Sequence, residues 1–435
     1  MRKKLDVTPP ENLRRRELAV VEQKRTYDLI TPLYGGGIKA NEADPITVVR
    51  ATEIRGQLRF WWRAMRGGQS ENDPTLKIRE DAIWGKAYEK KDEGIPPDQT
   101  IQLVVDITRE GTPIKPLEMR GPRPFAINDI PGYIAFPLQP DQKERRNARP
   151  IIPDVRQGVQ FILTISYPER LRDDIEAALW AWETFGGLGA RTRRGFGALS
   201  LVAVVGNGLP YQSPPRANEV KSWIEKQTQK YSKAGNFPEG VPHLGNTLQL
   251  AVTPPSRNPM EAWNRLIRKL QNFRQQKDAS QRSAWPEADT IRQIAKKGPA
   301  AAIKKFPRAA FGLPIIFHFT GKNAPEGNYT LNEAKVVTNA EPDKRSNKER
   351  FASPLILRPF LCADKQAVGI ALLLEGSRVN LENLVLQDDK RDLQSVNEKS
   401  RLSGTLTPGE ARSLTAKIPE LKNETDLLQA FLKSF

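Results

Sequence analysis

The chain has 435 residues, and its 68 lysines and arginines outnumber its 51 aspartates and glutamates, which gives a formal net charge of +17. This length exceeds what one hydrophobic core supports, so we expect two or three domains. The positive charge favours a phosphate-bearing partner, above all a nucleic acid. No apolar run approaches the ~20 residues of a membrane-spanning helix, and the basic first residues lack the apolar core of a signal peptide. We therefore expect a cytoplasmic protein with no membrane partner.

Cysteine and histidine usage argues against a disulfide or a metal centre. Cys362 is the single cysteine, which excludes an internal disulfide and a cysteine-based metal cluster and agrees with a reducing cytoplasm. His243 and His318 are the two histidines, which are too few for a His-rich metal site. We expect no metal and no cofactor.

The first predicted elements are a strand, a glycine run and a helix. Residues 18–31 are rich in β-branched and aromatic side chains and predict a strand, which Pro32 ends. The glycines at 35–37 leave backbone N–H groups exposed. Residues 52–66 carry apolar side chains at three- and four-residue steps, which predicts an amphipathic helix. Gly56 costs this helix about 1 kcal/mol relative to alanine, which indicates close contact with another group.

The same helix carries a stripe of arginines. Arg55, Arg59 and Arg63 are spaced four residues apart, and Arg66 follows three residues later. Neighbours in such a stripe lie about 6 Å apart, which is close to the phosphate spacing of an extended single strand. A solvated helix face is the simpler interpretation of a charge run. Within the helix only Glu53 is acidic, and the unrelieved repulsion favours binding of a polyanion.

The rest of the first half continues the alternation of strands and helices. Helices are predicted over residues 76–88 and 169–184, and strands over residues 101–109, 159–167 and 198–205. Residues 110–153 are proline-rich and basic with few periodic runs, and we interpret them as a mobile flap that orders on nucleic acid, plain disorder being the alternative. The resulting order β-α-β-β-α-β predicts an RRM-like, ferredoxin-like α+β domain.

A glycine-rich loop at residues 185–197 connects the second of these helices to the fourth strand. It carries three arginines among its glycines, which provide bidentate phosphate donors beside a backbone that another chain can approach closely. A Walker loop is excluded because no Lys-Ser or Lys-Thr follows the glycines. A dinucleotide fingerprint is disfavoured because Thr192 stands at the third glycine position and the order is helix, loop, strand. The alternative is a glycine-rich turn with solvated arginines.

A shift to Gly, Pro and Ser at residues 206–215 marks a domain boundary, which predicts domains over residues 1–206 and 207–435. Beyond it we predict helices over residues 259–276, 288–297 and 425–432, and strands over residues 246–252, 312–319, 354–361 and 367–374. This looser order predicts a second, degenerate ferredoxin-like domain with helical insertions, in tandem with the first.

Five segments together resemble a known family. They are residues 29–37, 54–63 with its double tryptophan, 186–197, 308–314 and 350–354. These residues resemble the RAMP superfamily of CRISPR RNA-binding proteins, and within it the subunit numbered one of type III-B (Cmr) effector complexes. The resemblance implies two tandem ferredoxin-like domains. It also implies binding near the 3′ end of the guide RNA, in contact with target RNA and other RAMP subunits, through RNA backbone and duplex shape.

The predicted RNA-binding residues follow from the glycine segments, the arginine stripe and this resemblance. They are Gly35, Gly36, Gly37, Arg55, Arg59, Arg63, Arg66, Gly187, Gly189, Arg191, Arg193 and Arg194.

Some RAMP relatives cleave RNA, so catalysis has to be weighed against binding. Metal-independent cleavage needs a general base and acid, commonly His with Lys or Tyr. His243 lies in a Val-Pro-His-Leu-Gly turn and His318 in an apolar strand, where packing is the commoner role. Asp44 precedes Pro45, where an Asx turn is the commoner role. We therefore expect a non-catalytic RNA-binding subunit, with no catalytic residues. The alternatives are a metal-independent endoribonuclease that processes CRISPR RNA and a purely architectural subunit.

Overall fold

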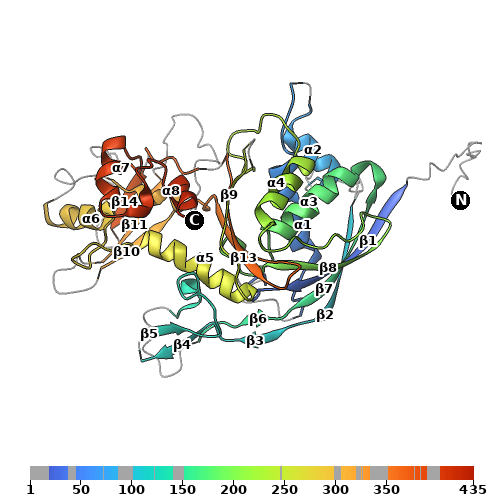
Figure 1. Cartoon of the computed structure of the whole chain (residues 1–435), viewed down its shortest axis with the longest axis horizontal. Coiled ribbons are helices and arrows are strands. Elements are labelled where there is room, and N and C mark those ends of the chain that lie inside the picture. Colours follow the sequence, from blue (N-terminus) through green and yellow to red (C-terminus); the bar gives the residue numbers. More distant parts are fainter. Residues whose placement is uncertain are drawn as a thin grey trace, which may run out of the picture.

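The computed structural model describes most of the chain. The described residues are 19–37, 46–71, 73–86, 101–121, 123–140, 151–244, 247–297, 305–319, 325, 327–333, 351–376, 378–382, 384–388 and 402–435. Figure 1 shows the four-stranded sheet of the first half and its helices at one end of the molecule. At the other end lie β10 (Ile315–His318), β11 (Asn328–Glu333), β14 (Leu384–Asp388), α6 (Pro286–Lys297) and α7 (Pro408–Thr415). Between them lie α5 (Pro259–Arg274), β9 (Gln249–Val252) and β13 (Ala367–Leu373). No helix in the described ranges is long and apolar enough to cross a membrane.

The first half is built on a four-stranded antiparallel sheet with the order β2-β7-β1-β8. Its strands are β1 (Val20–Leu29), β2 (Gln102–Arg109), β7 (Gln160–Pro168) and β8 (Leu199–Gly206). The helices α1 (Ala51–Arg66) and α3 (Arg172–Phe185) connect β1 to β2 and β7 to β8, so the predicted order β-α-β-β-α-β is confirmed for the chain segments that form this sheet. Alternate residues of β7 are buried, as expected for a strand with one face against a core.

Aromatic and apolar side chains hold α1 and α3 against the sheet. The predicted apolar face of α1 is buried, with Trp61 and Trp62 each at most 2% exposed. Tyr27 of β1 stacks on Phe161 with ring centroids 5.1 Å apart and meets the edge of Trp182 at 5.3 Å. Burying each large apolar side chain contributes about 1.5–3 kcal/mol, so this face fixes α1 and the loops at its ends relative to the sheet.

The proline-rich segment is packed where the structure describes it. It forms β3 (Thr112–Ile114), the hairpin of β4 (Leu117–Arg120) and β5 (Arg123–Ala126), and the 3₁₀ helix η2 (Phe136–Leu138), and β3 pairs with β6 (Val155–Gln157). Leu117, Ile134 and Leu138 are buried in the same core as Trp263. The mobile-flap interpretation is therefore wrong for residues 110–121, 123–140 and 151–153, and residues 141–150 lie outside the described residues. The described apolar residues of this proline-rich segment are buried one at a time. The segment therefore has no repeating hydrophobic pattern from which its packing could be predicted.

The second half contains two three-stranded antiparallel sheets, with the orders β12-β13-β9 and β10-β11-β14. The strands are β9 (Gln249–Val252), β10 (Ile315–His318), β11 (Asn328–Glu333), β12 (Leu355–Leu361), β13 (Ala367–Leu373) and β14 (Leu384–Asp388). The helices of the remaining chain are α2 (Leu76–Trp84), α4 (Val220–Tyr231), α5 (Pro259–Arg274), α6 (Pro286–Lys297), α7 (Pro408–Thr415) and α8 (Leu427–Lys433). The remaining 3₁₀ helices are η4 (Glu169–Leu171), η5 (Thr192–Arg194), η7 (Pro307–Phe311) and η9 (Pro419–Leu421).

The two halves share hydrophobic cores across position 206. Phe360 of β12 lies in the same core as Trp182 of α3, and Phe196 meets the edge of Trp263 with ring centroids 4.9 Å apart. Arg358 of β12 is fully buried and donates hydrogen bonds to the carbonyls of Glu183, Gly186 and Leu199 at 2.7–3.0 Å. The glycine-rich loop is thus anchored by residues from both halves.

Candidate nucleic-acid interface

The two predicted glycine segments lie against each other. The Ala190 N–H donates to the Tyr34 carbonyl at 2.6 Å, and the Gly197 N–H donates to the Pro32 carbonyl at 2.9 Å. Gly189 has φ +79°, and a Cβ on it would lie 2.4 Å from the Tyr34 carbonyl oxygen. Only glycine fits this position without a shift of the backbone. The structure therefore brings together residues 35–37 and the glycine-rich loop, as one backbone surface.

Glu53 at the start of α1 connects the two segments. Its carboxylate accepts the backbone N–H of Gly189 and lies 3.6 Å from the Cβ position of Gly36. Arg50 donates to the Gly36 carbonyl. Burial raises the pKa of Glu53, and the hydrogen bond from Gly189 and the charge of Arg50 oppose this rise. A partly buried carboxylate thus fixes both glycine segments at the N-terminus of α1.

Two of the three loop arginines bind carbonyls of the second half. Arg193 donates to the Ser353 carbonyl at 2.6 Å, and its guanidinium lies 5.5 Å from the ring centroid of Phe60. Arg194 donates to the Leu355 carbonyl at 2.6 Å. Burial lowers the pKa of Arg194 to about 9, and nearby guanidiniums add to this effect. These two side chains hold the loop in place.

Arg191 is arranged differently. Its backbone is left-handed, with φ 58°, and its guanidinium lies 4.8 Å from the ring centroid of Phe136. Its buried Nε atom has no hydrogen-bond partner, and the guanidinium forms no ion pair with any residue that the structure describes. Burial lowers its pKa, and the phenol groups of Tyr34 and Tyr133 oppose this. The contact between Phe136 and Arg191 could not be predicted from the sequence, because Phe136 lies in the proline-rich segment, which has no repeating pattern.

The arginine stripe is paired with residues outside α1. Arg59 and Arg63 both contact one carboxylate oxygen of Glu80, at 2.7 Å and 2.6 Å. Arg55 donates to the carbonyls of Trp84 and Ile101. The expectation of unrelieved repulsion is therefore wrong, because α2 supplies a carboxylate that the spacing along α1 does not reveal.

Positive charge remains in excess along this stripe. Arg66 contacts Asp174 at 3.3 Å, so the four guanidiniums of the stripe face the carboxylates of Glu80 and Asp174 among the described residues. The side chains of Arg59 and Arg63 are 27% and 30% exposed, which leaves their outer N–H groups accessible.

A Cβ on Gly56 would meet nothing within 4 Å, so the contact predicted at this glycine is not formed within the described chain.

The stripe and the glycine-rich loop lie on different sides of α1. Successive residues of a helix are rotated by about 100°, so Arg59 and Arg63, which face α2, lie roughly 60–120° around the axis from Glu53 and Phe60, which face the loop. The structure thus brings the two glycine segments together with Arg191, and places the stripe apart from them.

The candidate catalytic residues have packing or hydrogen-bonding roles. The His243 ring stacks on Phe237 with centroids 4.0 Å apart, and burial lowers its pKa despite the charge of Glu375. His318 contacts the side chain of Asn328 at 2.7 Å on the exposed face of β10. Asp44 lies outside the described residues. Within the described ranges no group of three or more His, Cys, Asp and Glu is placed to hold a metal ion.

Comparison with known proteins agrees with the family resemblance. The model of the RAMP superfamily matches residues 26–200, which run from β1 through the glycine-rich loop into β8. The CRISPR system Cmr subunit Cmr1-2 of Pyrococcus furiosus is 26% identical over 187 residues, which cover 40% of this chain and 93% of that protein. Cmr1-1 of the same organism is 27% identical over 156 residues, which cover 35% of this chain and 40% of that protein.

Solved structures with a related arrangement include a crystal structure of Cmr1 from Pyrococcus furiosus in its apo form. It has 17% sequence identity and a TM-score of 0.49, and the match covers 86% of this chain and 92% of that one. A type III-B Cmr-beta complex bound to cognate target RNA contains a chain with 14% identity and a TM-score of 0.45, over 88% of this chain and 99% of that one. Residues 26–200 thus match the model of the RAMP superfamily, and this chain is similar to the curated Cmr1 subunits.

Proposed function

We propose that this chain is a non-catalytic RNA-binding subunit of a type III-B CRISPR effector complex. It binds the guide RNA near its 3′ end, the guide–target duplex, or both, and it contacts neighbouring RAMP subunits. The curated relatives named as Cmr subunits support the assembly. The net charge of +17 supports a polyanionic ligand.

The observation that carries this proposal is a set of unused donors at the junction of the glycine segments. The N–H groups of Gly35, Gly36 and Gly37 donate to no backbone acceptor among the described residues, and the buried Nε of Arg191 has no hydrogen-bond partner there. Backbone N–H groups and an arginine are the donors that phosphate oxygens accept. Together they form a cradle for an RNA phosphate.

Such a cradle reads the RNA backbone and not its sequence. Contacts to phosphate position a nucleic acid without carrying base information. Sequence is then left to pairing between guide and target, as the resemblance implies. The arginine stripe contributes its excess charge on a neighbouring face of α1, where a second stretch of the RNA or a duplex edge would pass.

The domain organisation belongs to the same proposal. In the first sheet β7, the third strand of the motif, lies between β2 and β1, and in the second half β13 likewise lies between β12 and β9. A helix follows the first strand in both cases, α1 after β1 and α5 after β9. These parallels support two tandem ferredoxin-like domains, over residues 1–206 and 207–435, the second without the fourth strand.

The surroundings of the histidines support a subunit without catalysis. A general base needs an accessible ring nitrogen beside the reacting hydroxyl. His243 is stacked on Phe237, and His318 lies on a different sheet from the glycine segments. Defined cleavage of repeat RNA in EDTA that His243→Ala or His318→Ala abolishes would instead support the endoribonuclease.

The test is the salt dependence of RNA affinity in matched arginine variants. Arg191→Ala removes the cradle guanidinium, whereas Arg170→Ala removes an exposed arginine at the other end of α3, about 20 Å along the helix. Fluorescence anisotropy with labelled single-stranded RNA over a range of salt concentrations should show a slope smaller by ~0.7 for Arg191→Ala only. Equal slopes for both variants would contradict the proposed cradle.

A further inference from the structure

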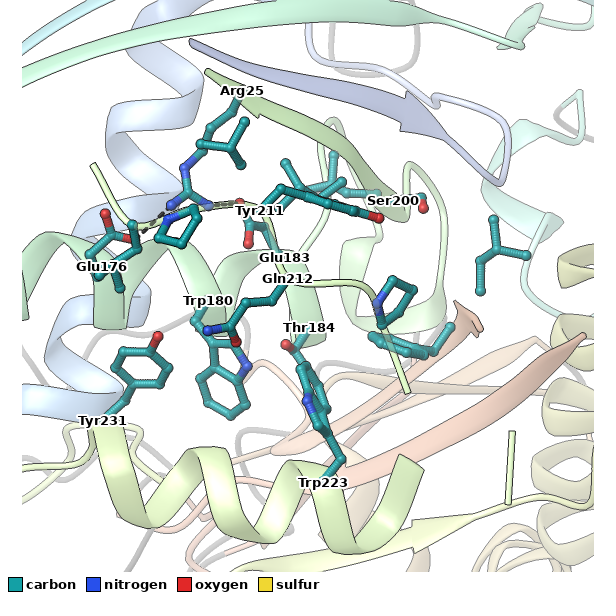
Figure 2. Close-up of a pocket in the computed structure, with 18 residues that line it drawn as sticks. Arg25, Glu176, Trp180, Glu183, Thr184, Ser200, Tyr211, Gln212, Trp223 and Tyr231 are labelled. Carbon is teal, nitrogen blue, oxygen red and sulfur yellow. Dashed lines mark hydrogen bonds and ion pairs between the residues drawn. The ribbon is translucent and has the colours of Figure 1, made fainter. Parts of the chain in front are cut away.

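A second candidate site lies beside the ends of the glycine-rich loop. A cavity of about 100 Å³ is lined by residues of β1, α3, the start of β8, α4, the end of β12 and residues 209–214, here called the covering segment. Figure 2 draws the side chains that line it. Thr184 and Leu199, which flank the loop, both line it. The cavity is separate from the donors of the phosphate cradle, since its polar side chains come from β1, α3, β8, α4 and residues 209–214 and include none of the cradle residues.

The inner wall of the cavity is a buried ionic network. Arg25 contacts Glu176 at 2.6 Å and Glu183 at 2.8 Å, and the Tyr27 hydroxyl donates to the same Glu183 oxygen at 2.6 Å. The guanidinium of Arg25 is therefore already occupied by two carboxylates of the protein. Both hydrogen bonds to Glu183 reach the same carboxylate oxygen, so its second oxygen is left to accept a hydrogen bond from a ligand.

The walls also contain donors without partners. Trp180 is 7% exposed, and its indole N–H has no hydrogen-bond partner in the described part of the chain. Trp180, Glu183 and Thr184 are spaced three and four residues apart on α3, so they share one face of the helix. Figure 2 shows Gln212 projecting from the covering segment into the same space. A buried N–H without a partner destabilises the folded protein, and a ligand with a matching acceptor would remove this cost.

The cavity is also aromatic. Trp223, Tyr231 and Phe360 line it together with Trp180, and Tyr211 of the covering segment is 40% exposed. Trp180 and Tyr231 already stack on each other, with ring centroids 5.5 Å apart. The exposed ring of Tyr211 is then the surface against which a planar ligand stacks.

We propose that this cavity binds an unstacked nucleobase with an exocyclic amine, whose amine donates to Glu183 and whose ring nitrogen or carbonyl accepts from the Trp180 N–H. Proteins that bind unstacked bases use this combination of base-edge hydrogen bonds and aromatic stacking. An organic cation fits less well, because an ammonium or guanidinium has no acceptor for the indole N–H.

The same geometry predicts base selectivity. Adenine and cytosine, like guanine, present an amine beside a ring acceptor, which matches one acceptor and one donor in the wall. Uracil also has an N–H beside a carbonyl acceptor, but this N–H lies between two carbonyl oxygens. When one oxygen accepts the Trp180 N–H, the other lies beside the Glu183 carboxylate and repels it. The base comes either from a free nucleoside or nucleotide or from an RNA strand, and the latter source rests on the proposed function.

The experiment uses neutral nucleosides, so that the basic surface contributes nothing. Isothermal titration of the full chain with adenosine, cytidine and uridine should show binding of the first two and not of uridine. Trp180→Phe removes the indole N–H and should weaken adenosine binding about 5- to 10-fold. Tyr211→Ala removes the stacking ring and should weaken it at least about 5-fold. Trp84→Phe is the matched control, because the Trp84 indole N–H is also buried without a partner but lies on α2, away from the cavity.

The outcomes separate the two sources and the two proposals. Binding of hexameric oligo(A) but not of adenosine, lost in Trp180→Phe, assigns the cavity to RNA, and binding of both assigns it to free nucleosides as well. Adenosine binding that persists when Arg191→Ala leaves RNA affinity unchanged would overturn the phosphate cradle but retain the cavity. Equal binding of adenosine and uridine would overturn the cavity proposal. So would absence of all binding, or no effect of either cavity variant.

Discussion

Gly189→Ala tests whether the contact between the two glycine segments is structural. The residue has φ +79°, and a Cβ would lie 2.4 Å from the Tyr34 carbonyl oxygen, which also accepts the Ala190 N–H. A left-handed backbone costs a non-glycine residue about 1–2 kcal/mol, and loss of the hydrogen bond costs about another 0.5–1.5 kcal/mol. Alanine recovers about 0.4–1 kcal/mol through the unfolded state. We expect a net loss of about 0.5–3 kcal/mol.

Gly56→Ala is the matched control, because it makes the same substitution at a glycine outside the contact between the two glycine segments. A Cβ on Gly56 meets nothing within 4 Å, and the residue lies inside α1, so alanine should stabilise the protein by about 0.5–1 kcal/mol. Urea denaturation followed by tryptophan fluorescence measures both variants. The midpoint should fall for Gly189→Ala and rise for Gly56→Ala. A midpoint for Gly189→Ala equal to or above that of the wild type would refute the reasoning.

Three further predictions concern buried charge and pH. Arg358→Met should lower the urea midpoint, because three buried carbonyls lose their donor at about 1–3 kcal/mol each; an unchanged midpoint would mean that water replaces the guanidinium. The double variant Arg59→Ala, Arg63→Ala should destabilise the protein, because Glu80 is 6% exposed and would lose both partners, and it should reduce RNA affinity less than loss of the cradle arginine does. Burial lowers the pKa of His243 below its ordinary 6.5, so below pH 6.5 the unfolded state binds a proton that the folded state does not. Stability should therefore fall as the pH decreases from 6.5 toward the folded pKa, and His243→Gln should flatten this fall in denaturation curves measured across that window; parallel curves would contradict it.

Elements with a strong local period could be predicted from the sequence. The helix α1 was expected over residues 52–66 and spans Ala51–Arg66, because its apolar face recurs at helical steps. The helix α4 was missed although Val220, Ile224 and Thr228 are buried at four-residue steps. This four-residue pattern indicates a helix, but it directly follows the Gly-, Pro- and Ser-rich residues 206–215, which indicate a domain boundary.

Features that depend on contacts between elements could not be predicted in this way. Glu80 neutralises the stripe from α2, and no spacing within α1 reveals that pairing. Arg193 and Arg194, which are predicted to bind RNA, donate to the carbonyls of residues 353 and 355, and the distance along the sequence hides these contacts. Phe136 lies beside the guanidinium of Arg191 and belongs to a segment with no repeating hydrophobic pattern. Local patterns predicted helices such as α1, whereas the contacts of single side chains depend on tertiary packing.

The most direct test of the account is crosslinking of RNA within the assembled effector complex, followed by identification of the crosslinked peptides. The account predicts crosslinks on this chain in the peptides that contain residues 34–37 and 186–197, at the junction of the two glycine segments. Crosslinks confined to neighbouring subunits, with none on these peptides, would contradict it and would favour a purely architectural role.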